Sequence, residues 1–404
     1  MARADYPILD ADGHVMDRPE HFEEFCEPGV VLPHVLIDQK TQTRYWLLDD
    51  GRLLSRPMGP NTGAGIGFID HPDHPVLGRK LPAMRARDNG ALDDIAGRLE
   101  DMDQEGIDLA VLYPTLMLGL PFFRDKDLAA ALARGYNNYV ANRLKGQEGR
   151  LRAAAVVPLQ DPPAAIEELR RAKSLGFVAV MVTGVVGDGN NTKTLDQEEF
   201  FPFFQECDRL DMPVAVHSVA GAYSLPWADI FDRSFYYSHL VAHPFTQMIA
   251  LATIIGGGLL ERLPRIRFAI LETGCGWVPH WLWWMDEHFE DDRYIKERAI
   301  LFGRNEMPYL KKLPSEYVRE GRIFFHAHEA EPELPRLLEM GLGGQLMYAS
   351  DYPHEDAAFP ESVNKLQARA DLPEAVKRQI LGENAMRFYG IAVTEKARPV
   401  APVG

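Results

Sequence analysis

Cysteine is scarce in this chain, which has only three in 404 residues. Cys26, Cys207 and Cys275 lie far apart, and no two of them form a CxxC pair. A sparse, odd-numbered set argues against a disulfide framework and suits a reducing compartment. The first residues, MARADYPILD, contain no apolar stretch of the length that a secretory signal needs. We therefore expect a cytoplasmic protein.

Basic residues are also fewer than acidic residues. The chain has 43 Lys and Arg against 59 Asp and Glu, which gives a formal net charge of −16. Because no basic stripe is present to neutralise phosphates, we expect neither a nucleic acid nor an anionic membrane as a partner. A small anionic substrate is not excluded, because local Arg and His residues decide its binding.

Long apolar runs and phosphate loops are missing as well. The apolar runs that stand out, IIGGGLL and HWLWWM, are too short to span a membrane. The glycine-rich GPNTGAGIGF lacks both the preceding strand and the Lys-Ser/Thr of a phosphate loop. With 46% hydrophobic and 25% charged residues, the composition is that of an ordinary soluble globular protein. We expect it to bind a small molecule.

What the sequence does contain is a series of short apolar runs that alternate with amphipathic stretches. The pattern predicts eight buried parallel strands, at 8–14, 108–114, 153–159, 177–182, 213–218, 268–272, 322–327 and 346–351. Between two of them, Asp161 and Pro162 provide a helix N-cap and a first helical residue, and Gly176 ends that helix. Another helix has Ile95, Leu99 and Met102 on one face and ends at Gly106. This alternation predicts an α/β protein with a (β/α)8 TIM barrel.

One stretch interrupts the alternation. Residues 20–90 have little helical periodicity, and we expect them to form a cap inserted after the first strand, over the barrel mouth. Within it, 44–55 (RYWLLDDGRLLS) predicts a hairpin around Asp50-Gly51. Arg56, Arg85 and Arg87 of the insertion are either substrate-neutralising cations or solvated surface charge. We assign residues 1–390 to a single barrel domain and 391–404 to a tail.

Potential metal ligands follow several of the predicted strands. Asp12 and His14 alternate on the first strand, so their side chains face the same way and can bind one cation together. The fifth strand ends at His217 (VAVHS), the sixth at Glu272 (FAILE) and the eighth at Asp351 (LMYASD). Because the C-terminal ends of parallel barrel strands meet at one mouth, these side chains are expected to converge there. The pattern predicts a metallo-enzyme.

Four segments together resemble the amidohydrolase superfamily, in particular the amidohydrolase-related branch that includes aminocarboxymuconate semialdehyde and resorcylate decarboxylases. The segments are ADGHVMD, AVHS, LETGCGWVPHWLWWMDEH and YASDYPHED, and they span residues 10 to 356. The resemblance implies a divalent metal held by Asp12, His14, His217 and Asp351. Zinc or manganese suits this ligand set best, iron is possible, and a second metal remains open. Many relatives carry His-x-His on the first strand, and here Asp12 replaces the first His.

Two readings of the chemistry depend on Glu272. The leading expectation is a hydrolase, in which metal-bound water attacks a carbonyl-type centre and Asp351 also takes up a proton. The alternative is a non-oxidative decarboxylase of an aromatic or unsaturated acid. The decarboxylase relatives place a His at the end of the sixth strand, whereas Glu272 would repel a substrate carboxylate there. Glu272 can instead shuttle a proton, bridge a second metal in an oxygenase, or orient a metal ligand. A non-catalytic binding barrel ranks last.

Further histidines complete the set of predicted site residues. His354 follows Asp351 in the same loop and is assigned a catalytic role, as are Asp351 and Glu272. His243 and His326 are assigned to substrate binding, although for each a purely structural contact is the alternative. The resemblance and the tryptophan-rich run after Gly276 favour a homodimer, with a small molecule as the substrate.

Overall fold

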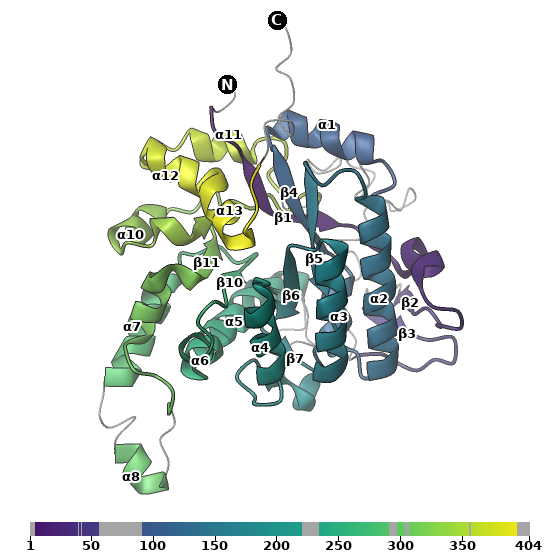
Figure 1. The fold of residues 1–404 in the computed structure, drawn as a ribbon, viewed down its shortest axis with the longest axis horizontal. Helices are drawn as coiled ribbons and strands as arrows, with labels where there is room; N and C mark the ends of the chain where they lie inside the picture. Colours follow the sequence, from purple (N-terminus) through teal and green to yellow (C-terminus); the bar gives the residue numbers. More distant parts are fainter. Residues whose placement is uncertain are drawn as a thin grey trace, which may run out of the picture.

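Eight parallel strands form the centre of the molecule (Figure 1). The computed structural model describes residues 5–38, 40–41, 43–55, 91–219, 234–290, 297–303, 307–354 and 357–393. The strand order is β1-β4-β5-β6-β9-β10-β11-β12. The strands are β1 (Leu9–Val15), β4 (Leu109–Pro114), β5 (Leu151–Val156), β6 (Ala179–Thr183), β9 (Val214–His217), β10 (Phe268–Ile270), β11 (Ile323–His326) and β12 (Leu346–Met347). Each overlaps one of the eight predicted runs.

The first strand also meets the last. The Ala11 amide donates to the Tyr348 carbonyl at 3.0 Å, and the Asp351 amide donates to the Asp12 carbonyl at 2.9 Å. These bonds bring the two edges of the sheet together, so the eight strands form a nearly closed barrel. The predicted TIM-barrel fold is confirmed.

Helices surround the barrel, and in Figure 1 α2, α3 and α4 stand next to one another outside β5 and β6. The longer ones are α1 (Ile95–Glu105), α2 (Lys126–Arg143), α3 (Pro162–Leu175), α4 (Phe201–Leu210), α5 (Phe235–Gly256) and α7 (Val278–Glu290). The shorter ones are α6 (Leu259–Arg262), α8 (Arg298–Phe302), α9 (Pro314–Tyr317), α10 (Leu334–Glu339), α11 (Ser362–Gln367), α12 (Glu374–Arg378) and α13 (Asn384–Tyr389).

The predicted helix signals act as expected. The Asp161 carboxylate accepts a hydrogen bond from the Ala164 amide, which caps the start of α3. α3 ends at Gly176, whose φ of 93° lies in the left-handed region that glycine adopts without a steric penalty. α1 ends in the same way at Gly106.

α3 and α4 are joined by an ion-pair network around Glu206. Hydrogen bonds from Arg209 and Arg170 lower the pKa of Glu206 from 4.5 to about 2. A carboxyl group whose pKa is lower in the folded than in the unfolded protein stabilises the fold at any pH above its unfolded-state pKa. For Glu206 this stabilisation is lost as the pH falls toward 2. Because both guanidinium groups are largely exposed and therefore screened by solvent, we expect the ion pairs to contribute about 1 kcal/mol to the free energy of unfolding.

Replacing Glu206 by Gln is therefore expected to lower the free energy of unfolding by about 1 kcal/mol at pH 7. Urea denaturation followed by circular dichroism measures the difference, which should shrink as the pH is lowered from about 4.5 toward 2, the range that separates the two pKa values. Glu167→Gln, which alters a more exposed carboxylate on α3, is the control and should change little. An effect of Glu206→Gln that is constant across this pH range would contradict the ion-pair explanation.

α5 corrects one statement of the sequence analysis. Tyr236–Gly256 is long and apolar enough to cross a membrane by length and composition, so the expectation that no run reaches that length was wrong. Polar His, Ser, Thr and Gln residues interrupt this segment, so it does not stand out in the sequence as a continuous apolar run. The helix nevertheless packs on the barrel, because the buried Gln247 amide donates to the carbonyls of Val216 and Leu271 at 2.9 and 3.2 Å. We regard α5 as a barrel helix.

The inserted segment is described as far as residue 55. β2 (His34–Ile37) and β3 (Arg44–Leu47) form an antiparallel pair, and a bridge between Leu47 and Leu53 closes the predicted turn at Asp50-Gly51. The Arg124 amide donates to the Leu54 carbonyl at 2.7 Å, so this part of the insertion contacts the loop after β4. Arg56, Arg85, Arg87, the glycine-rich 59–68 and tail residues 394–404 lie outside the described residues.

Candidate metal centre

The first pair of ligands depends on an irregularity in β1. Asp10 pairs with Ala110 but Gly13 pairs with Leu112, so β1 has one extra residue between them. A bulge of this kind redirects the neighbouring side chains. The Asp10 carboxylate secures the segment by accepting hydrogen bonds from the Asp12 amide and from the amide and hydroxyl of Ser350. Burial raises the pKa of Asp10 to about 6.

Four buried atoms from two strands, β1 and β9, and from the loop after β12 converge at the barrel mouth. Asp12 Oδ1 lies 3.5 Å from His14 Nε2 and 3.3 Å from His217 Nε2. Asp351 Oδ1 lies 3.1 Å from His14 Nε2. None of the four atoms has a hydrogen-bond partner among the described residues. Buried polar atoms are nearly always satisfied, so this convergence fits a ligand set that closes around a cation.

The tautomers of both histidines suit metal binding. His14 Nδ1 lies 2.9 Å from the Pro114 carbonyl, and His217 Nδ1 lies 2.8 Å from the Ser218 carbonyl. Because a carbonyl oxygen only accepts, each Nδ1 carries the hydrogen and each Nε2 keeps its lone pair facing the cluster. This is how metal-binding histidines are held in proteins.

The charge of the cluster also favours a cation. Three carboxylates, those of Asp12, Glu272 and Asp351, line it. Burial lowers the pKa of His14. Burial also opposes protonation of His217, but the carboxylates of Asp12 and Glu272 outweigh it and raise the pKa of His217. The negative charge thus attracts a cation, for which a divalent metal is well suited.

Asp351 and His354 form a close pair at the edge of this cluster. Asp351 Oδ1 lies 2.8 Å from His354 Nδ1, and His354 Nε2 lies 3.0 Å from the hydroxyl of Thr115. Burial opposes ionisation of Asp351, but His354 and His14 lower its pKa well below the usual value. The φ angle of Asp351 is 56°, in the left-handed region that L-residues rarely adopt. Such strained positions are concentrated at active sites.

Glu272 is held from the other side of the cluster. The Ser218 hydroxyl donates to Glu272 Oε2 at 2.5 Å, and His217 Nδ1 lies 3.2 Å from the same oxygen. Ser218 Oγ also lies 3.0 Å from His243 Nδ1, which links His243 to the cluster through this hydroxyl. Burial opposes ionisation of Glu272, but His217 and His243 lower its pKa. Glu272 also has a positive φ, of 64°.

Most of the predicted site residues therefore come together. Asp12, His14 and His217 form one possible ligand set, and His14, Glu272, Asp351 and His354 form another that shares His14. His243 reaches the cluster through Ser218, and burial lowers its pKa to about 4. His326 ends β11 and belongs to neither set, but it is buried and neither ring nitrogen has a hydrogen-bond partner among the described residues. The roles assigned to these residues stay predictions.

The sequence analysis missed several residues that hold the site in place. Ser218 directly follows His217, which was the only signal for it. Asp17 accepts hydrogen bonds from the amides of Thr115, Leu116 and Met117 and so fixes the loop that bears Thr115. The buried Arg98 donates to the His14 carbonyl at 2.9 Å and lies over the Tyr352 ring. An arginine within an amphipathic helix gives no sequence signal for this contact.

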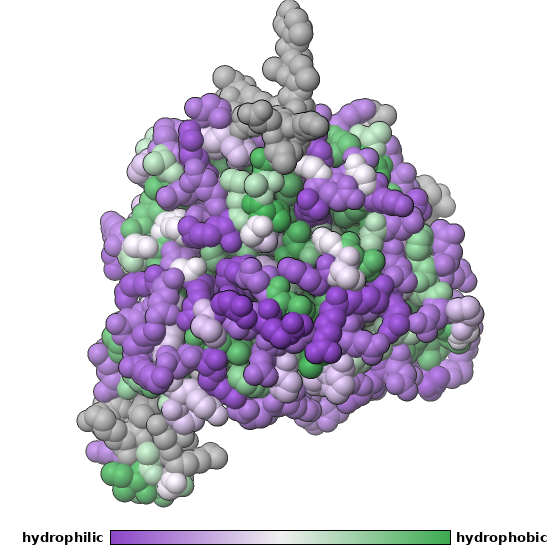
Figure 2. All heavy atoms as spheres, in the orientation of Figure 1, coloured by the Kyte–Doolittle hydropathy of each residue, from purple (hydrophilic) through white to green (hydrophobic). Residues whose placement is uncertain are grey.

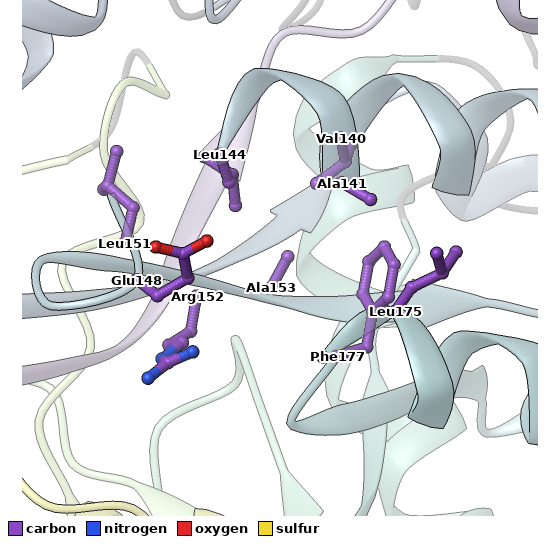
Figure 3. A pocket seen from close by; sticks show the side chains of 10 residues that line it. Val140, Ala141, Leu144, Glu148, Leu151, Arg152, Ala153, Leu175 and Phe177 are labelled. Atoms are coloured by element: carbon purple, nitrogen blue, oxygen red, sulfur yellow. The ribbon is translucent and has the colours of Figure 1, made fainter. Parts of the chain in front are cut away.

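Two pockets lie elsewhere on the barrel. One of about 60 Å³ is lined by α2, β5 and the turn between α3 and β6 (Figure 3). It includes Leu151, the first residue of β5, and Gly176, which precedes β6, so it is at the end of the barrel opposite the metal ligands. The other, of about 300 Å³, lies between the loops after β4, β5 and β6. Neither contains a predicted site residue.

Comparisons with known proteins identify the family of this fold. The amidohydrolase family model matches residues 10–391. Gamma-resorcylate decarboxylase of Polaromonas sp. strain JS666 is 26% identical over 302 residues, which cover 72% of this chain and 83% of the relative. The 2-amino-3-carboxymuconate-6-semialdehyde decarboxylase of Dictyostelium discoideum is 24% identical over 303 residues, which cover 73% and 76%.

Solved structures show the same fold. An amidohydrolase from Mycobacterium avium subsp. paratuberculosis K-10 superposes with a TM-score of 0.68 at 17% identity, covering 96% of this chain and 99% of the other. A 5-carboxyvanillate decarboxylase from Novosphingobium aromaticivorans, with bound manganese, gives 0.67 at 19% identity and covers 96% and 98%. The resemblance seen in the sequence and the prediction of an amidohydrolase-type enzyme are confirmed: the chain belongs to the amidohydrolase family.

Proposed function

We propose that the protein is a metal-dependent, non-oxidative decarboxylase of a small aromatic or unsaturated carboxylic acid. The observation that carries the proposal is the convergence of Asp12, His14, His217 and Asp351 on one point of an amidohydrolase barrel. The relatives that share this barrel decarboxylate such acids. The leading expectation of hydrolysis is supported only at the level of the family, and the decarboxylase alternative fits the relatives better.

The environment of Glu272 weakens the main objection to a decarboxylase. Its Oε2 accepts a hydrogen bond from Ser218 and lies next to His217. This oxygen is therefore engaged within the protein rather than free to face an incoming carboxylate. We propose that Glu272 orients His217, as carboxylates next to metal-binding histidines commonly do.

Asp12, His14, His217 and Asp351 would hold one divalent metal, for which manganese and zinc are the first candidates. When bound, such a metal polarises an oxygen of the substrate and stabilises the negative charge that develops on it. We assign His243 and His326 to substrate binding, because His243 reaches the cluster through Ser218 and His326 ends the neighbouring strand β11. We also propose that residues 20–90 cover the mouth, since their described part contacts the loop after β4.

The proton needed by the reaction is assigned to the Asp351–His354 pair, whose atoms are 2.8 Å apart. Decarboxylation adds one proton to the carbon that bears the carboxylate. The bond to the carboxylate then breaks, its electron pair returns to the substrate, and carbon dioxide leaves. The pair gives up one proton per turnover and recovers it from solvent. Location and assembly follow the sequence analysis: we propose a cytoplasmic homodimer.

The proposal is tested by incubating the purified protein, loaded with Mn²⁺, with 2,6-dihydroxybenzoate, 5-carboxyvanillate and a panel of related acids. Release of carbon dioxide in step with loss of the acid is the expected result. Parallel reactions with amide and ester substrates in ¹⁸O-labelled water test hydrolysis. Label in the products, with no carbon dioxide from any acid, would favour the hydrolase instead and overturn the proposal.

Ser218→Ala probes the support of Glu272. Hydrogen bonds to charged groups are worth about 1.5–3 kcal/mol, so we expect kcat to fall ~10- to 100-fold. KM and the bound metal should change little, because Ser218 is not among the ligands. Ser218→Thr, which keeps the hydroxyl, is the matched variant and should recover most of the activity. A raised KM at unchanged kcat would assign Ser218 to substrate binding instead.

A further inference from the structure

Glu331 lies in the loop after β11, and its carboxylate faces the loop after β10. The Cys275 amide donates to its two oxygens at 2.9 and 3.0 Å, and the Gly276 amide donates to Oε1. The Cys275 thiol donates to Oε2 at 3.1 Å. Consecutive backbone N–H groups that point to one place form a concave anion site, which here is occupied by the chain's own carboxylate. Its position just before α7 also suits a negative charge.

Two glycines make room for this carboxylate. A Cβ atom added at Gly274 or at Gly276 would lie 2.8 Å from Glu331 Oε1, which is closer than real Cβ atoms approach. Gly274 also has a positive φ, of 60°, which glycine adopts without a steric penalty. The Gly-Cys-Gly sequence of this loop therefore fits the carboxylate closely.

Acidic residues are common in this chain, so an acid near a helix needs no special role. There are 59 Asp and Glu residues, and hydrophilic residues predominate on the face seen in Figure 2. Glu331 differs from an ordinary surface acid because three groups of another loop donate to it. Its backbone is fixed as well, since the Arg369 guanidinium donates to the carbonyls of Glu329 and Glu331 at 3.1 and 2.8 Å. A carboxylate on a fixed backbone can hold the loop after β10 in one conformation.

Glu272 lies between two anchored parts of the loop after β10. On the β10 side, the Leu271 amide donates to a carbonyl of β9 at 3.1 Å. On the α7 side, Glu331 holds Cys275, three residues after Glu272. The positive φ of Glu272, 64°, is a strained conformation that persists only where the surrounding structure holds it. Release of the α7 side is therefore expected to let Glu272 move away from Ser218.

We propose that Glu331 is a positioning residue, which holds the loop after β10 so that Glu272 stays next to His217 and Ser218. Glu331 belongs to neither ligand set and acts through Glu272. The inference rests on the proposed role of Glu272 in orienting His217. It makes the loop after β11 part of the support of the metal centre.

Cysteine labelling tests the contact without any substrate. Cys275 and Cys207 are both fully buried, so iodoacetamide reaches either one only when the protein opens around it. Glu331→Gln replaces one accepting oxygen with an NH2 group, and labelling of Cys275 should accelerate ~10-fold or more while that of Cys207 stays the same. Mass spectrometry of the digested protein measures both rates. An unchanged rate at Cys275, or an equal acceleration at both cysteines, would overturn the proposal.

Kinetics test whether the contact acts through Glu272. With the metal-loaded protein and an acid that the wild type decarboxylates, Glu331→Gln should lower kcat ~10-fold and leave KM and bound metal nearly unchanged. The double variant Ser218→Ala/Glu331→Gln should be about as slow as the slower single variant, because both changes release the same carboxylate. Effects that multiply would show that Glu331 acts independently of Glu272. Glu333→Gln, at an exposed acid two positions further on, is the control and should match the wild type.

Gly276→Ala tests the contact without changing Glu331. The added methyl group would lie against Glu331 Oε1, so this variant should reproduce both the faster labelling and the lower kcat. Gly149→Ala, where nothing lies within 4 Å of the added Cβ, is the matched control and should change neither. A Gly276→Ala protein that behaves like the wild type would contradict the proposal. The expected labelling pattern in a protein that releases no carbon dioxide would support the Glu331 contact and count against the proposed function alone.

Discussion

Asp351→Asn should lower kcat for carbon dioxide release by ~1,000-fold or more, within the range that removal of an acid–base group causes. The change removes the charge that pairs with His14 and His354 and weakens one of the four proposed metal ligands. Asparagine tolerates the left-handed backbone that Asp351 adopts, so the loop should keep its conformation. The effect should therefore be chemical rather than structural.

Asp211→Asn is a closely matched control. Asp211 also has a positive φ, of 48°, but it ends α4 and pairs with Arg267 at the surface. The same change in the same backbone region should leave kcat within about twofold, because a surface ion pair contributes little. Steady-state kinetics at saturating Mn²⁺, with thermal unfolding to check the fold, measures both variants. An Asp351→Asn enzyme with more than a tenth of wild-type kcat would remove Asp351 from the mechanism.

Metal removal is expected to abolish activity altogether. Dialysis against a chelator should leave less than ~1% of carbon dioxide release, since a metal that stabilises developing charge contributes several kcal/mol. Adding back Mn²⁺ or Zn²⁺ should restore it. Elemental analysis of protein purified without added metal should find one equivalent per chain.

Substitutions separate the metal ligands from their neighbours. His14→Ala and His217→Ala should each lose most of the bound metal, because each removes a nitrogen that faces the cluster. His326→Ala is the control: it removes another buried histidine, at the end of β11, that belongs to neither ligand set, so metal content should persist while KM rises. Two equivalents per wild-type chain, lost together in His14→Ala, would replace the mononuclear site with the dinuclear alternative.

The barrel could be predicted because each of its strands appears in the sequence as a short apolar run. All eight overlap observed strands, and the glycine and aspartate signals place the ends of α1 and α3 correctly. Parallel strands buried on both faces leave a strong hydrophobic signature. Once the fold is known, its geometry brings His217 and Asp351 together although 134 positions separate them (351 minus 217).

The details of the site could not be predicted, since they depend on backbone geometry and on contacts across the barrel. Nothing in ILDADGH reveals the bulge between Asp10 and Gly13. The hydroxyl of Ser218 acquires its role only because β9 and β10 are neighbours, which brings Glu272 within 2.5 Å. α5 was overlooked because polar residues are spread along an otherwise apolar helix.

The left-handed backbone at Glu272 and Asp351 implies a trade-off between stability and activity. Each such position costs of order 1–3 kcal/mol for an ordinary L-residue, whereas glycine adopts it freely. Replacing either residue by glycine would therefore relieve backbone strain. The variant would have a higher melting temperature than the wild type but would lack one of the two carboxylates. Searches for thermostable variants of this barrel should exclude both positions, because the most stabilising replacements there would select for a well-folded but inactive protein.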